Sequence, residues 1–139
     1  MNGAVLFLIA TTAAPSTCAD EVRAAAIASR LSELPREVRD DLMLLTEGAM
    51  ADSDSPLLQT DAPTAAERGQ GTVRFAQGLL VGGKWFAQFE VSMFAGVRTV
   101  AYVRNQDGRF RRSPMHYFGG PACASIRAAL DGVTTPGGF

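Results

Sequence analysis

The sequence is short of the side chains that build metal centres. Its 139 residues include a single histidine, His116, and two cysteines, Cys18 and Cys123. A zinc site needs a fuller set of His, Cys and carboxylate ligands at defined spacing, and no such set surrounds these residues. The acidic stretch at 52–54 lacks the glycine and the closing glutamate of a calcium-binding loop. We therefore predict neither a metal site nor a cofactor.

Charged residues are also few, at 19% of the chain, and the net charge is −1. Hydrophobic residues reach 47%, which is enough for a core and excludes wholesale disorder. The charges are unevenly spread, because residues 1–71 hold eleven acidic and five basic side chains, whereas residues 72–139 hold three and eight. We interpret this asymmetry as attraction between the two halves of one fold. The alternative is a basic surface for an anionic partner.

No apolar stretch has the length that crosses a bilayer, which is about 20 residues. The stretch at 4–14 has instead the length of a signal-peptide core, although no Lys or Arg precedes it. Small residues that suit a cleavage site follow at 17–19. We predict a signal peptide at residues 1–19, export to the periplasm or the exterior, and no transmembrane span in the mature chain. The alternative is a cytoplasmic protein in which residues 4–14 are a buried element.

The fate of Cys18 depends on this processing. Cleavage after Ala19 would remove it, whereas a retained Cys18 could form a disulfide with Cys123. Lipidation of Cys18 fits poorly, because Pro15 and Thr17 stand where lipoprotein signals carry a leucine and a small residue.

The first half of the predicted domain, which spans residues 20–133, is helical at residues 20–50. Apolar residues recur there at helical spacing in two stripes, Ile27, Leu31 and Leu34 and then Val38, Leu42, Leu45 and Ala49. Pro35 separates the stripes and fits the first turn of the second helix. Residues 52–70 are rich in Asp, Ser and Pro and are predicted to be a loop.

A four-stranded antiparallel β-meander is predicted over residues 72–112. Its turns lie at Gly82-Gly83, at Ala95-Gly96 and at residues 105–108. The first turn would pair Ala76 with Phe89 and Leu80 with Trp85, and the second would pair Phe89 with Tyr102. A C-terminal helix at about residues 122–131 and a flexible tail at 134–139 complete an α+β fold, in which the helices pack on one sheet face.

The two faces of this sheet differ. The first is apolar, with an arginine rim, and is predicted to receive the helices; it carries Leu80, Trp85, Phe89, Val91, Met93, Val100 and Tyr102. The second has apolar ends and a polar centre, which is formed by Gln77, Gln88, Glu90, Ser92 and Thr99. Apolar walls around a few polar groups are typical of a binding surface. The alternative is a second layer, covered by the N-terminal segment or the C-terminal tail.

These patterns predict a small exported, non-enzymatic binding module of the cell envelope or exterior, which engages a protein or a small ligand through the second face. One alternative is a thiol enzyme, with Cys123 in the first turn of the last helix and His116 as its base. Another is polyanion binding by a set of five arginines, Arg98, Arg104, Arg109, Arg111 and Arg112. The pI of about 5.8 argues against a nucleic-acid partner.

Overall fold

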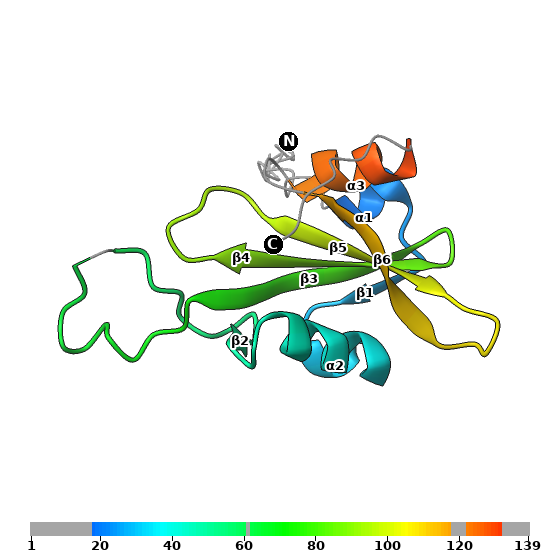
Figure 1. Cartoon of the computed structure of the whole chain (residues 1–139). Coiled ribbons are helices and arrows are strands. Elements are labelled where there is room, and N and C mark those ends of the chain that lie inside the picture. The colour runs from blue at the N-terminus through cyan, green and yellow to red at the C-terminus, as the bar shows by residue number, and fades with distance from the viewer. Residues whose placement is uncertain (1–17, 61, 118–121, 132–139) are drawn as a thin grey trace, which may run out of the picture.

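The computed structural model describes residues 18–60, 62–117 and 122–131, and it is an α+β fold built on one sheet (Figure 1). The helical elements are α1 (Cys18–Val22), the 3-10 helix η1 (Leu31–Glu33), α2 (Arg36–Leu45) and α3 (Ala122–Leu130). The strands are β1 (Ala26–Ala28), β2 (Met50–Ala51), β3 (Val73–Val81), β4 (Lys84–Val91), β5 (Arg98–Arg104) and β6 (Phe110–Tyr117). They lie in the order β1-β3-β4-β5-β6, all antiparallel, and β2 adds a short parallel pair to β3. The predicted α+β class with an antiparallel sheet is confirmed.

One face of the sheet packs against α2 and η1. Val38 and Leu42 lie one turn apart on α2, so both side chains point at the sheet and are fully buried. They share a core with Trp85, Phe89 and Tyr102, which alternate along β4 and β5 as the sequence predicted for the first face. The other buried residues of this core are Ala28, Leu34, Met50, Phe75, Ala87, Val100 and Phe110.

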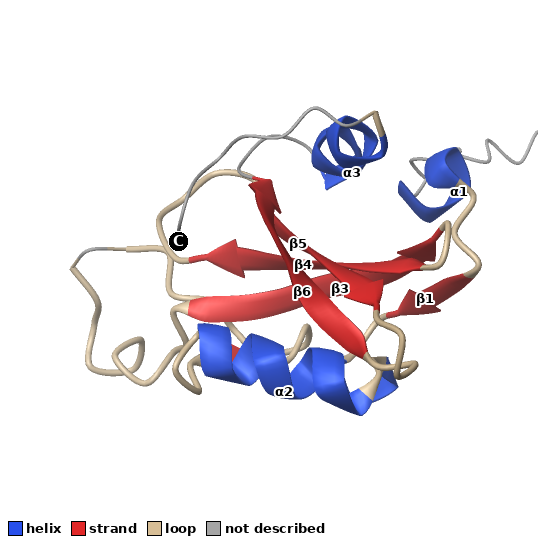
Figure 2. Cartoon of the chain, turned by 45° about the vertical axis from the view of Figure 1, so that its right-hand side comes forward, coloured by secondary structure: helices blue, strands red, loops and turns tan. Residues whose placement is uncertain are grey.

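The other face packs against α1 and α3. Leu79 and Phe86 from the sheet form a second core with Ala19 and Ile126 from these helices. Figure 2 shows α1 and α3 together on the side of the sheet opposite α2. The prediction that helices pack on one face only is therefore wrong. The physical reason is that β3 and β4 carry large apolar residues on both faces, and such a sheet needs cover on both.

The first predicted helix is not continuous, because the structure divides this stretch into α1, β1 and η1. The structure ends α1 at Val22, places Arg23 at a φ of 54° and then pairs β1 with the edge of β3. The backbone N–H of Ala25 begins this pairing by donating to Leu80 O at 2.7 Å. Helix propensity in this alanine-rich stretch is a weak preference, and the unpaired backbone groups of β3 outweigh it.

The β3–β4 hairpin has the predicted register near its turn, from Val81↔Lys84 to Gln77↔Gln88. A β-bulge at Ala76 then shifts the pairing, so that Phe75, and not Ala76, lies opposite Phe89. The extra residue turns Phe75 into the first core, where it is fully buried, and turns Arg74 onto the second face. The predicted placement of these two side chains was therefore reversed.

The β4–β5 connection also differs from prediction. A six-residue loop, 92–97, replaces the two-residue turn at Ala95-Gly96, and Phe89 lies opposite Arg98 rather than Tyr102. The loop needs positive φ at Met93 (69°) and at Gly96 (79°). The register moves by an even number of residues, so the division of β4 and β5 into two faces is unchanged.

Other predicted elements are close to those observed. Pro35 precedes the first turn of α2, the C-terminal helix is α3, and β6 extends beyond the predicted end at 112 to Tyr117. None of the helices among the described residues combines the length and the apolar character that crossing a bilayer requires. Most of the predicted signal peptide, residues 1–17, and the predicted tail at 134–139 lie outside the described residues.

Candidate functional site

The polar centre of the second face forms a row of hydrogen bonds that crosses three strands. Gln77 Nε2 donates to Gln88 Oε1 at 2.8 Å, and Gln88 Nε2 donates to Thr99 Oγ1 at 3.0 Å. The row ends on α3, where Ser125 Oγ lies 2.8 Å from Thr99 Oγ1. Neighbouring strands place Gln77, Gln88 and Thr99 side by side, so their polar side chains bond to one another across the sheet.

This row lies beneath α3. Gln88 and Thr99 are fully buried and Ser125 is 6% exposed. Buried amides and hydroxyls are tolerated when they bond to one another, and here they tie α3 to the sheet. Gln88 and Thr99 are therefore closed to solvent in this structure. The expectation from the sequence that these two residues contact a ligand directly stays a prediction.

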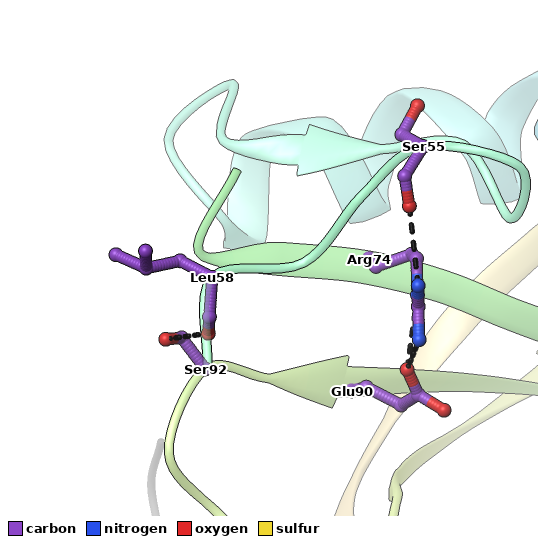
Figure 3. Close-up of polar contacts among 5 residues, drawn as sticks. All are labelled: Ser55, Leu58, Arg74, Glu90 and Ser92. Carbon is purple, nitrogen blue, oxygen red and sulfur yellow. Dashed lines mark hydrogen bonds and ion pairs between the residues drawn. The ribbon is translucent and has the colours of Figure 1, made fainter. Parts of the chain in front are cut away.

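The second face remains open beyond α3, at the end where Arg74 and Glu90 lie opposite each other (Figure 3). Arg74 Nε donates to Glu90 Oε2 at 3.0 Å, and Arg74 Nη2 donates to the same oxygen. Arg74 Nη1 donates to Ser55 O at 3.2 Å. The two side chains are 29% and 33% exposed, so the pair is accessible from solvent.

The loop at 52–60 borders this open end. Ser92 Oγ donates to Leu58 O, as Figure 3 shows, and Leu58 N donates to Gly71 O at 2.9 Å. Leu57 also forms an isolated parallel bridge with Gly71. These contacts hold the loop against the start of β3 and the end of β4, so it forms a wall beside the ion pair.

A depression of about 250 Å³ lies between this wall and the loop at 92–97. Phe94 is 65% exposed at its edge, and the Arg98 guanidinium lies 5.4 Å from the centre of its ring. The depression thus combines an apolar surface with a charged pair, and its lining residues are Leu57, Gln59, Arg74, Glu90, Phe94, Gly96 and Val97.

Four of the five predicted anion-binding arginines lie at the β5–β6 hairpin, and Arg98 lies apart from them. Arg98 begins β5 and Arg104 ends it, so a strand length of about 20 Å separates them. Arg104 lies over the ring of Phe110 at 4.8 Å. The others, Arg109, Arg111 and Arg112, lie in or just before β6.

Acidic residues of α2 lie beside these β6 arginines. Arg112 Nε lies 3.4 Å from Asp41 Oδ2, which also accepts a hydrogen bond from Tyr102 OH at 2.7 Å. Glu37 Oε1 accepts from the backbone N–H of Phe110 at 3.2 Å. Hydrogen bonds from its own backbone N–H and from that of Phe110 lower the pKa of the Glu37 carboxyl. This arrangement is the one expected if the acidic and basic halves attract each other.

The predicted thiol pair is Cys123 with His116. The structure places Cys123 in the first turn of α3, half-buried, and places His116 in β6 opposite Val100. The side chain of His116 lies outside the described part. Cys123 packs instead in the same apolar cluster as Cys18. Burial, and then this neighbouring thiol, raise the pKa of Cys18 to about 12.

Arg74 was not predicted as a partner of Glu90, because the bulge at Ala76 changes which face Arg74 occupies. Opposite charges on neighbouring strands are a recognised pairing signal, and the arginine and glutamate could have been matched on that ground. The wall at 52–60 had no such signal, since its contacts are made by backbone atoms and one serine.

Within the described residues, no three or more His, Cys, Asp or Glu side chains gather in a group that could hold a metal ion. Comparisons with family models, with curated proteins and with solved structures found no match to this chain.

Proposed function

We propose that the protein is a small exported binding module that engages a peptide segment of a partner protein at the depression beside Arg74 and Glu90. The observation that carries this proposal is a partly exposed ion pair set next to an exposed aromatic side chain. Apolar area together with a few oriented polar groups is what gives a binding site both affinity and specificity.

Glu90 supplies the polar half of the site. Both hydrogen bonds from Arg74 end on Oε2, and Oε1 points away from Arg74 (Figure 3). An ionised carboxylate has about four acceptor positions, so Oε1 is able to accept from a ligand. Arg74 also holds Glu90 in place, because its third contact ties it to Ser55 O. A fixed acceptor loses little conformational freedom when it binds.

Phe94 supplies the apolar half, and Val97 and Leu57 also line the depression. A peptide suits this pairing, because each of its residues offers a backbone N–H donor next to a side chain. We expect the bound segment to donate to Glu90 Oε1 and to place an apolar side chain against Phe94.

The export part of the proposal rests on the sequence at residues 4–19. The geometry gives less support to the two alternative functions, thiol catalysis and polyanion binding. Cys123 packs against a second thiol in an apolar cluster, and Arg98 lies a strand length from Arg104.

The proposal is tested by selecting binders from a displayed library of random peptides and measuring the dissociation constants of synthetic copies by fluorescence anisotropy. Phe94→Ala removes most of the apolar contact and Glu90→Gln removes the charged acceptor. We expect each to weaken binding by about tenfold, which is about 1.4 kcal/mol.

Leu44→Ala is the matched control, because Leu44 is 75% exposed and lies on α2, on the opposite side of the sheet. It should leave the dissociation constants unchanged. The proposal is overturned if no peptide is enriched, or if the enriched peptides bind the Phe94 and Glu90 variants as tightly as they bind the parent protein.

A further inference from the structure

The two cysteines lie at opposite ends of the described chain and meet between α1 and α3. Cys18 is 6% exposed, and Cys123 packs against the same apolar cluster, which includes Phe86 and Ile126. The Cys123 thiol is close enough to Cys18 to contribute to its raised pKa. These are also the only cysteines in the sequence, so each is the other's only possible disulfide partner within the chain.

A second contact joins the same two helices one turn away. Arg127 Nη2 lies 2.5 Å from Glu21 Oε2. Cys123 and Arg127 are four residues apart on α3, and Cys18 and Glu21 are three apart on α1, so each pair lies on one face of its helix. Figures 1 and 2 both show α1 and α3 on the same side of the sheet. The ion pair therefore aligns the turns that carry the cysteines.

We infer that Cys18 and Cys123 form a disulfide bond in the exported protein, which joins α1 to α3 across the second face of the sheet. Disulfides form and persist in the oxidising environment outside the cytoplasm. The inference rests on the export part of the proposed function and is independent of the depression at Arg74 and Glu90.

The bond forms by exchange with an external disulfide, such as an oxidised low-molecular-weight thiol. The more exposed Cys123 attacks as a thiolate, forms a mixed disulfide and releases the first external thiol. Cys18 then loses its proton and attacks Cys123 Sγ, which releases the second external thiol. The two protein thiols are oxidised to one disulfide, and the external disulfide is reduced to two thiols.

This bond requires that processing leaves Cys18 in the mature chain. Cleavage after Ala19 would remove Cys18 and Ala19, both of which are buried in the second core. The sequence offers an earlier site, because Ala14 and Ser16 have the spacing of small residues that a signal peptidase accepts. Cleavage after Ser16 would begin the mature protein at Thr17, one residue before Cys18.

The test is intact mass spectrometry of the full chain expressed with its own leader in a bacterium that has a periplasm. The protein is denatured and treated with N-ethylmaleimide, with or without prior reduction. We expect a mature chain that retains Cys18, with no adduct before reduction and two adducts after it. Cys18→Ser and Cys123→Ser are the controls, and each should show one adduct after reduction.

A second arm separates this inference from export. The full chain, purified in reduced form, is incubated with oxidised glutathione, and we expect a monomer that lacks free thiols and carries no glutathione. If the protein forms this monomer in glutathione but is not exported by the bacterium, the export proposal is contradicted. The proposed closeness of the two thiols is then still supported. The inference is overturned if the oxidised protein carries only mixed disulfides with glutathione, if the exported protein takes two adducts without reduction, or if its mature chain lacks Cys18.

Discussion

Arg74 and Glu90 lie directly opposite each other on β3 and β4 because the β-bulge at Ala76 shifts Arg74 by one position. In the regular register that the turn at Gly82-Gly83 sets, Arg74 would lie on the other face of the sheet. One extra residue therefore brings the two charges of the candidate site together. It also buries Phe75 in the opposite core.

The coupling between these two charges is measurable with Arg74→Gln, Glu90→Gln and the double variant. Both side chains are about one third exposed, so solvent screens their attraction. We expect the double-mutant cycle to give a coupling of about 0.2–1 kcal/mol in the free energy of unfolding, measured by urea denaturation. The coupling should shrink as the salt concentration rises, and a coupling that salt leaves unchanged would contradict this account.

The buried row of hydrogen bonds predicts that substitutions of its two glutamines lower the free energy of unfolding by unequal amounts. Gln88→Leu removes the central member and leaves a donor on Gln77 and an acceptor on Thr99 without their partner in the row. Since Gln88 is fully buried, we expect a loss of about 1–3 kcal/mol in the free energy of unfolding.

Gln77→Leu is the matched control for that variant, because Gln77 is half-buried at the open end of the row. Gln77→Leu removes one hydrogen bond of the row and keeps the bond between Gln88 and Thr99, so its loss should be clearly smaller. Equal losses for the two variants in chemical denaturation would show that the row does not carry the stability assigned to it.

Tyr102 predicts a loss of stability at alkaline pH. Burial, and then its hydrogen bond to Asp41, raise the pKa of the Tyr102 phenol. The folded state therefore favours the protonated phenol. This contribution is complete below the ordinary tyrosine pKa of about 10 and is lost as pH rises above it. Urea unfolding at a series of alkaline pH values should show a shallower decline for Tyr102→Phe than for the parent protein.

The raised pKa of Cys18 adds an alkaline loss of its own when the thiol is free, and this loss begins at the ordinary cysteine pKa of about 8.5. Both proteins in the comparison retain Cys18, so the difference between their slopes isolates Tyr102. Identical slopes above pH 10 would contradict the effect assigned to the phenol.

A side chain at Gly78 is predicted to destabilise the fold. A Cβ atom at this position would lie 2.6 Å from Leu34 Cδ2 and 3.3 Å from Ala28 Cβ, and both residues are buried. Overpacking of this kind costs about 1–3 kcal/mol. Gly78→Ala should lower the free energy of unfolding by that amount. Gly69→Ala is the control, because a Cβ there meets nothing within 4 Å, and a similar loss in both variants would contradict the steric explanation.

The sequence predicted the elements whose signals are local. Gly82-Gly83 set the β3–β4 register as far as Gln77, and Pro35 marked the start of α2. β1 was not predicted, because Ala26 and Ala28 favour helix locally and become a strand only through pairing with β3. The loop at 92–97 was missed because an alanine and a glycine also fit a tight turn.

The candidate site was predicted in part. Alternation along β4 placed Gln88 and Glu90 on one face, and the structure has them there. The cover over Gln88 and the partner of Glu90 depend on α3 and on the bulge, which are tertiary features. A bulge residue such as Ala76 is chemically ordinary, and nothing in a single sequence marks it.

The position of Trp85 makes the two sides of the sheet separately observable. It is the only tryptophan, and it is buried in the core that α2 covers. Its fluorescence therefore reports on that layer alone, whereas in the reduced protein the chemical reactivity of the Cys18 thiol reports on the layer under α1 and α3. Recording both signals along one denaturation curve would reveal whether the two layers melt as a single cooperative unit or in succession.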